Sequence, residues 1–277
     1  MRTFTVPAGL PVGIARRRPA VGEGVRVEEW ASRRLGELAR VTVEPVSRAS
    51  RRVQYWMLNG VALTDDLARI DPRLRFELTY MADRPIGWER PKTAGHNHGR
   101  PASGSIGFAE VCEILEGTAG FLVQDLQPGP AATFAALVTV RPGERIILPP
   151  FLQHLTIDLA GDPLVFSDVI SRRITGDYEG LAAAHGGAYL VGPRGEARPN
   201  PAYRSLPPLE RLTAEGWAGE AARHPVPLYQ QLLADPAALA WLDEPDTFPD
   251  RFSELWARLR PVYERLPGMA AALARAR

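Results

Sequence analysis

The sequence FAEVCEILEGTAGFLVQDL, residues 108–126, holds two short apolar runs that are joined by a glycine-containing turn. Similar runs of five to eight residues flank it on both sides, at 52–58, 74–81, 134–140, 145–149 and 163–170. Glycine, proline and aspartate separate these runs, and no helical pattern lies between them. Many short strands at close spacing are typical of a β-sandwich or barrel and not of a parallel sheet. The middle of the chain is therefore predicted to be all-β.

The segment before these runs has a different character. Residues 1–24 are rich in proline, glycine and arginine, which predicts an irregular arm. Three apolar side chains in the range 27–40 fall on one side of a helix, so we expect a short helix there.

The segment 206–277 is predicted to be helical. Its apolar residues between 252 and 263 recur at helical spacing, although Pro261 would kink or divide such a helix. An earlier stretch, 227–242, also predicts a helix, with a break near Pro236. We therefore expect a C-terminal α-helical appendage. The three expected parts are an N-terminal arm with a short helix (1–49), a β-barrel (50–205) and a helical tail (206–277).

Composition excludes several classes of protein. The chain has 277 residues, with 33 basic against 32 acidic side chains, and a net charge of +1 does not suit a protein that coats nucleic acid or anionic lipid. Its single cysteine excludes an intrachain disulfide and a cysteine-built zinc knuckle. The amino end lacks the apolar stretch of a signal peptide, and no window approaches the ~18 apolar residues that span a bilayer. We expect a soluble, cytoplasmic protein with no nucleic-acid or membrane partner.

Three histidines and one glutamate form a pattern that indicates a metal site. In TAGHNH, residues 93–98, His96 and His98 are two positions apart, so an extended backbone points both to one face. Glu110 opens a strand after a loop rich in glycine and serine, and His154 follows a Pro-Gly turn, a strand and two prolines. Imidazole and carboxylate ligands suit Fe, Mn, Ni, Co or Zn. Four such ligands leave coordination positions for substrate oxygens.

These motifs resemble the cupin-type glucose-6-phosphate isomerases, which are small metal-dependent β-barrels known chiefly from archaea. The similarity includes T-x-G-H-x-H at 93–98, A-E-V followed by L-E-G at 109–117, and P-G with P-P-F-L-Q-H at 142–154. It continues through G-D-P-L-V-F at 161–166 and G-D-Y at 176–178, and weakly to N-P-A-Y at 200–203. The similar region covers roughly residues 50–205.

The resemblance implies a cupin barrel, that is, a double-stranded β-helix or jelly roll, with one divalent transition metal ion. Its implied ligands are His96, His98, Glu110 and His154. It further implies a homodimeric isomerase of carbohydrate metabolism, in glycolysis or gluconeogenesis, that acts on a small phosphorylated sugar. The implied reaction interconverts fructose 6-phosphate and glucose 6-phosphate, by either an enediol or a hydride shift. Glu110 is the only obvious catalytic carboxylate in the motif.

The resemblance also implies substrate contacts. Thr79, Thr93 and the backbone of Gly95 fall where the family holds the phosphate, and hydroxyl and backbone N–H groups suit phosphate oxygens. Tyr178 belongs to the matching G-D-Y motif and is a further expected contact. Lys92 adjoins Thr93, yet alternation along an extended chain turns its side chain away.

Three positions depart from the family pattern. Cys112 stands where these isomerases usually carry tyrosine, and Ile170 and Gly176 replace a second tyrosine and a histidine. Alternation places Cys112 on the same strand face as Glu110, where we expect it to contact substrate, and turns Glu113 to the opposite face. The pattern therefore leaves other functions open. These are a metal-dependent cupin enzyme of different chemistry (a dioxygenase, epimerase or dehydratase) and a non-catalytic sugar-binding protein.

Overall fold

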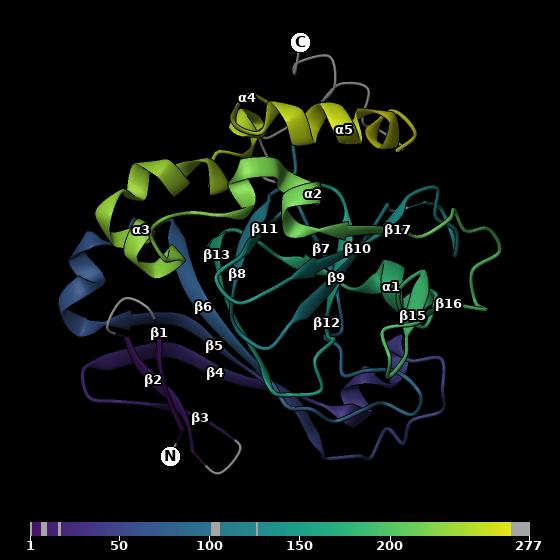
Figure 1. Cartoon of the computed structure of the whole chain (residues 1–277), viewed down its shortest axis with the longest axis horizontal. Helices are drawn as coiled ribbons and strands as arrows, with labels where there is room; N and C mark the ends of the chain where they lie inside the picture. Colours follow the sequence, from purple (N-terminus) through teal and green to yellow (C-terminus); the bar gives the residue numbers. More distant parts are fainter. Residues whose placement is uncertain (1, 7–9, 16–17, 101–105, 126, 267–277) are drawn as a thin grey trace.

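The computed structural model describes residues 2–6, 10–15, 18–100, 106–125 and 127–266 (Figure 1). Its strands are β1 (Arg2–Val6), β2 (Leu10–Ala15), β3 (Arg18–Val21), β4 (Val25–Arg34), β5 (Val53–Leu63), β6 (Leu74–Met81), β7 (Asn97–His98), β8 (Glu110–Glu116), β9 (Ala119–Gln124), β10 (Ala135–Val140), β11 (Arg145–Leu148), β12 (Gln153–Asp158), β13 (Leu164–Ser171), β14 (Gly176–Asp177), β15 (Tyr189–Val191), β16 (Ala197–Pro199) and β17 (Glu210–Thr213). Its α-helices are α1 (Glu179–Ala183), α2 (Ala214–Ala218), α3 (Leu228–Ala234), α4 (Phe248–Arg251) and α5 (Ser253–Tyr263). Its 3-10 helices are η1 (Leu35–Val41), η2 (Thr64–Arg69), η3 (Gly219–Ala222), η4 (Pro236–Leu242) and η5 (Pro245–Thr247).

Two sheets form the barrel at the centre of Figure 1. The larger has the strand order β11-β8-β13-β6-β5-β4, and the smaller has the order β12-β9-β10-β17. All pairings within the two sheets are antiparallel except that of β17 with β10. The seven strands predicted from the sequence are all present, and the predicted all-β barrel with a C-terminal helical segment is confirmed.

Strand β6 shows that the larger sheet has an apolar outer face and a polar inner face. Its sequence LRFELTYM alternates, so Leu74, Phe76, Leu78 and Tyr80 share one face and Arg75, Glu77 and Thr79 share the other. The apolar face points out of the barrel and packs against the tail, where the Phe76 and Tyr229 rings lie 5.0 Å apart. The polar face lines a cavity inside the barrel. The exterior of this sheet therefore needs a cover, which the two ends of the chain provide.

The N-terminal segment corrects the sequence prediction. The described part of residues 1–24 forms a three-stranded sheet, β1-β2-β3, and not an irregular arm. The helix expected over 27–40 is also wrong: residues 25–34 are the strand β4, and only η1 is helical. The cause is tertiary, because β4 pairs with β5 along its length and this pairing outweighs the helical spacing of a few apolar side chains.

The tail is helical as predicted. The break near Pro236 is confirmed, since α3 ends at Ala234 and Asp235 caps η4 by accepting a hydrogen bond from the backbone N–H of Ala238. Pro261 does not divide α5, because it lies in the last turn and removes only one hydrogen bond there. Among the described helices, none is long and apolar enough to cross a membrane. The three-part division of the chain stays a prediction, with β4 and β17 extending the barrel sheets beyond 50–205 on both sides.

Buried polar contacts fix the tail to the barrel. Glu113, on the outward face of β8 as predicted, pairs with Arg145 and accepts a hydrogen bond from the backbone N–H of Leu228 at 2.9 Å. The hydroxyl of Tyr229 accepts a hydrogen bond from the backbone N–H of Leu63 and donates one to Asp66, each at 3.0 Å. The start of α3 is thereby fixed to the barrel by the carboxylate of Glu113 and by the hydrogen bonds of Tyr229.

We expect the Tyr229→Phe substitution to lower the free energy of unfolding by about 1–3 kcal/mol, because it leaves buried polar partners unsatisfied. Urea unfolding followed by circular dichroism measures this loss. Tyr263→Phe is a matched control, since the Tyr263 hydroxyl is buried and has no hydrogen-bond partner within the described residues. Its removal should leave stability unchanged or raise it, and equal losses in the two variants would contradict the proposed role of the Tyr229 contacts.

Candidate active site

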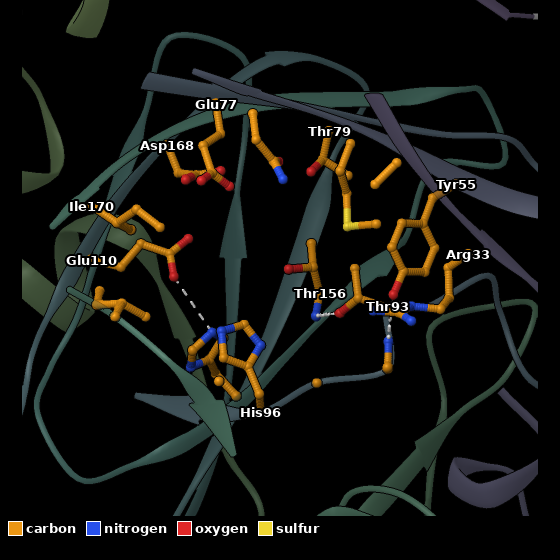
Figure 2. A pocket seen from close by; sticks show the side chains of 18 of the residues that line it. Arg33, Tyr55, Glu77, Thr79, Thr93, His96, Glu110, Thr156, Asp168 and Ile170 are labelled. Atoms are coloured by element: carbon orange, nitrogen blue, oxygen red, sulfur yellow. Dashed lines mark hydrogen bonds and ion pairs between the residues drawn. The ribbon is translucent and has the colours of Figure 1, made fainter. Parts of the chain in front are cut away.

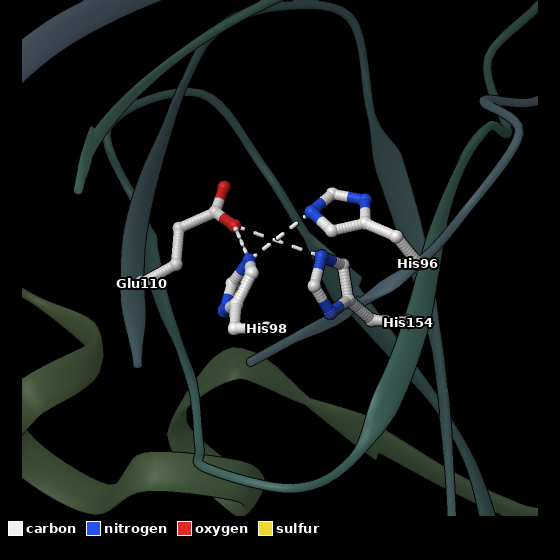
Figure 3. Close-up of side chains that lie close together, drawn as sticks. All are labelled: His96, His98, Glu110 and His154. Carbon is white, nitrogen blue, oxygen red and sulfur yellow. Dashed lines mark hydrogen bonds and ion pairs between the residues drawn. The ribbon is translucent and has the colours of Figure 1, made fainter. Parts of the chain in front are cut away.

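Four side chains converge inside the barrel (Figure 3). The ring nitrogens of His96, His98 and His154 and a carboxylate oxygen of Glu110 all lie within 4.8 Å of one another. His98 Nε2 is 3.1 Å from His96 Nε2 and 3.0 Å from Glu110 Oε2, and His154 Nε2 is 3.6 Å from the same oxygen. The structure therefore brings together the four residues that the sequence predicted as metal ligands.

The backbone sets the position of two of these ligands. His96 and His154 exchange two backbone hydrogen bonds, at 3.0 and 2.9 Å, so their side chains leave neighbouring strands side by side. Gly95 makes this approach possible. It adopts φ +71°, and a Cβ atom there would lie 2.8 Å from the carbonyl oxygen of His154 and 2.7 Å from Leu155 Cβ. The glycine of the T-x-G-H motif is thus required by conformation and by space.

Electrostatics suit this cluster to a cation. Burial lowers the pKa of His96 to about 4 and holds the pKa of His154 well below its usual range, so both rings are neutral at pH 7. Burial disfavours a charged Glu110, but the hydrogen bond with His98 and the other imidazoles outweigh this effect, so the pKa of Glu110 lies below its usual value. Three imidazoles and one carboxylate with free electron pairs fit a divalent transition metal ion.

The cluster forms part of the wall of a cavity of about 280 Å³. Alternate residues of β4, β5, β6 and β13 supply most of the remaining wall. Figure 2 shows Arg33, Tyr55 and Thr93 on one side and Glu77, Asp168 and Glu110 on the other. The volume is near the lower limit of small-molecule sites. A second arginine, Arg75, also lines the cavity and forms an ion pair with Glu77.

The predicted substrate contacts are distributed unevenly around this cavity. Thr79, Thr93, Gly95 and Tyr178 line it, as do Ile170 and Gly176 at two of the positions that depart from the family pattern. Cys112 is not among the lining residues, which corrects its assignment as a substrate contact. It shares the face of Glu110 as expected, but its thiol is fully buried and donates a hydrogen bond to Glu110 Oε1 at 2.9 Å. Burial raises the pKa of this thiol well above its usual value, so it stays protonated.

The sequence prediction missed the cationic side of the cavity. Arg33, on β4, lies 5.9 Å from the ring centroid of Tyr178 and lines the cavity together with Tyr55, which has a buried hydroxyl. The same hydroxyl accepts a hydrogen bond from the backbone N–H of Ala94 at 3.2 Å. Thr93 Oγ1 accepts a hydrogen bond from the backbone N–H of Thr156, so its own proton is available to a ligand. A correct strand assignment for residues 25–34 would have revealed Arg33.

The prediction also missed Glu77 and Asp168, which line the cavity on facing positions of β6 and β13. The alternation in LRFELTYM was the available signal for Glu77, since it separates polar from apolar faces. By contrast, the expectation for Lys92 is confirmed. Its amine pairs with Glu89 at 2.5 Å and lies outside the cavity lining.

Comparisons with known proteins agree with the motifs. A profile of the family described as Glucose-6-phosphate isomerase (GPI) matches residues 44–205. The glucose-6-phosphate isomerase of Pyrococcus furiosus is 25% identical over 125 residues, which are 45% of this chain and 61% of that enzyme. Solved structures with partial likeness include Peruvianin-I, a cysteine peptidase from Thevetia peruviana latex (17% identity, TM-score 0.30, 39% of this chain and 56% of that one). An oxalate decarboxylase has 15% identity and a TM-score of 0.29 over 42% of this chain and 25% of its own.

Proposed function

The chain belongs to the glucose-6-phosphate isomerase family, and from this we propose that it is a metal-dependent sugar-phosphate isomerase that interconverts fructose 6-phosphate and glucose 6-phosphate. The observation that carries the proposal is a buried cluster of three histidines and a glutamate in the wall of a cavity with a cationic far side. The family match supplies the reaction class, and the cavity supplies a volume and a charge distribution that suit a small phosphorylated sugar.

The phosphate group would lie at the side of the cavity that contains Arg33. Thr79, Thr93 and Gly95 line the same cavity, and Figure 2 shows Thr93 next to Arg33. Arg33 adds a guanidinium, and its neighbour Tyr55 keeps its proton because burial raises the pKa of the phenol. Hydroxyl and guanidinium groups can both donate hydrogen bonds to the oxygens of a phosphate group that carries two negative charges.

One divalent ion (Fe, Mn, Ni, Co or Zn) bound by His96, His98, Glu110 and His154 would supply a Lewis acid for the sugar carbonyl. The chain keeps two of the imidazoles neutral by burial, so no proton has to leave them at pH 7. Burial of His98, Glu110 and His154 also restricts their orientation, and the backbone hydrogen bonds between His96 and His154 fix where these two side chains begin.

The direct test is a coupled assay of the protein with fructose 6-phosphate after loading with each of the five metals in turn. Formation of glucose 6-phosphate with at least one metal is the expected result. Stoichiometric metal binding without turnover of the sugar phosphate, for all five metals, would contradict the proposal. Oxygen uptake by the ferrous form would instead favour an oxygenase.

We expect Arg33→Ala to raise KM for fructose 6-phosphate by about 10- to 100-fold with a smaller effect on kcat, because a charge-assisted hydrogen bond to phosphate is lost. The neighbouring Arg34 is a matched control. It is exposed, lies on the same strand and does not line the cavity, so Arg34→Ala removes the same charge from outside it. Steady-state kinetics of both variants decide the point, and equal changes in KM would show that only the net charge matters.

A further inference from the structure

Asp168 is a buried carboxylic acid that has no hydrogen-bond or ion-pair partner among the described residues. Its side chain is 5% exposed and lines the cavity. Its oxygens are not among the fully enclosed polar atoms that lack a partner, so the carboxyl group opens onto the cavity. The barrel keeps such a group in its cavity, which points to a ligand that satisfies it.

Glu77 lies directly opposite Asp168, because the two residues are paired in the register of β6 and β13. Figure 2 shows both carboxyl groups next to each other, on the side of the cavity away from Arg33. Both occupy positions that alternation directs into the barrel. The pair therefore faces the space that a ligand would occupy, on the same side of the cavity as Glu110 (Figure 2).

The surroundings of the pair affect its protonation. Burial raises the pKa of Asp168 well above its usual range, and Glu77 and Glu110 add to this effect. Burial also raises the pKa of Glu77 to about 7, against the attraction of Arg75, with which Glu77 forms an ion pair. The other groups that act on the pair are Glu29 on β4 and Cys112 on β8. Burial and mutual repulsion therefore favour the protonated form of Asp168, while the ion pair with Arg75 favours the charged form of Glu77.

Glu110 is poorly placed for proton transfer. Its carboxylate accepts hydrogen bonds from His98 and from the thiol of Cys112, and ligation of a cation would occupy it further. The isomerisation of an aldose and a ketose through an enediol needs a base that can take a proton from carbon and an acid that can serve the oxygens.

We propose that Glu77 and Asp168 are the proton-transfer pair of the isomerisation. This inference rests on the proposed sugar-phosphate isomerase function. Starting from the ketose, one carboxylate takes a proton from C1. The C–H electron pair becomes the C1–C2 double bond, and the carbonyl electron pair moves to O2, which takes the proton of the other carboxyl group.

The second half of the reaction restores the pair. The carboxylate that gave its proton to O2 takes the proton of O1, whose electron pair forms the C1 carbonyl. The electron pair of the double bond then takes a proton at C2 from the first carboxyl group. One proton is held by the pair at the start and at the end, and no external reactant is consumed.

Three variants of the full-length, metal-loaded protein test this assignment. Asp168→Asn and Glu77→Gln each remove one member of the pair and keep its shape, and Asp162→Asn removes an exposed carboxylate from the loop before β13. We expect kcat to fall by about 10²- to 10⁴-fold in the first two variants, with KM changed by less than about threefold. Metal content and thermal stability should match those of the unmodified protein, and Asp162→Asn should behave like it in every respect.

Two further readouts separate catalysis from structure. Turnover of fructose 6-phosphate by the unmodified protein in D₂O should place deuterium at C2 of part of the product, which mass spectrometry detects. If the pair transfers the proton, kcat of the unmodified protein should change with pH as the pair gains or loses its proton. That change should be absent from the pH profile of the Asp168→Asn variant. Glu77→Gln also breaks the ion pair with Arg75, so Asp168→Asn is the cleaner variant.

The outcomes are distinct. Retention of kcat in both variants would overturn the assignment, as would a rise in KM alone, which would mean that the pair only binds sugar hydroxyls. A product without solvent deuterium would indicate direct hydrogen transfer between the carbons and would also overturn it. Loss of a second bound metal ion in Asp168→Asn would make the pair a metal site instead. If the unmodified protein has no isomerase activity with any metal, the proposed function itself fails.

Discussion

Glu110→Ala will lower kcat/KM for fructose 6-phosphate by about 10³-fold or more, and His154→Ala will do the same. Loss of one of four ligands weakens retention of the ion, and the stabilisation by a Lewis acid that disappears with it is worth several kcal/mol, or about a factor of ten for each 1.4 kcal/mol. The measurement is steady-state kinetics together with the metal content of each purified variant.

His224→Ala serves as the control for these variants. His224 is exposed in the tail, where its ring contacts the backbone of Val226, and it lies outside the cluster. Its substitution should leave activity and metal content unchanged. Removal of the ion by a chelator should reproduce the loss in the unmodified protein, and readdition should restore turnover. Turnover that persists without both Glu110 and His154 would contradict the metal site.

Gly95→Ala should have the second large effect. A side chain at φ +71° is strained, and its Cβ would collide with Leu155 and with the carbonyl of His154. We expect the free energy of unfolding to fall by about 2–4 kcal/mol, since a left-handed conformation costs about 1–2 kcal/mol and overpacking about 1–3 kcal/mol. The backbone pair of His96 and His154 would also shift, so metal affinity should fall by about 10- to 100-fold, as it does when support of a ligand is lost.

Gly143→Ala isolates the steric part of this effect. Gly143 has a similar φ of +80°, but nothing lies within 4 Å of the position that its Cβ would take. The variant should lose about 1–2 kcal/mol from conformational strain alone, with unchanged metal affinity. Denaturant unfolding and metal titration of both variants distinguish the two contributions. Equal metal affinities in Gly95→Ala and Gly143→Ala would show that Gly95 does not position the ligands.

Local sequence patterns were sufficient for most of the barrel and for the metal-ligand cluster. Alternation and turn residues located β6 at 74–81 without error. A strand that buries one face shows alternating apolar and polar residues wherever it lies in the fold. The cluster was predictable since two of its members lie two residues apart on one chain segment and the others follow recognisable motifs. The side chains that complete a cavity carry no such signal when they come from distant strands.

The missed residues show where local patterns fail. Strand β4 is defined by pairing with β5, and residues 25–34 contain only a few apolar positions, so Arg33 was assigned to a helix. Glu77 and Asp168 lie in runs that were correctly read as strands. These two residues face each other because of the register between β6 and β13. That register is set when two distant segments pair, so neither segment alone predicts it. Cys112 was placed on the correct face, but its full burial and its hydrogen bond to Glu110 depend on packing that alternation along one strand does not encode.

The contact between Cys112 and Glu110 also gives this molecule an internal reporter. The chain has one cysteine, and its side chain is 0% exposed, so a thiol reagent can reach it only when the strands around Glu110 separate. The rate of thiol modification therefore measures the free energy of local opening at the ligand cluster, as hydrogen exchange does for a backbone amide. Binding of an ion by Glu110 would slow that reaction in proportion to its affinity, so metal occupancy can be followed by mass spectrometry without any substrate.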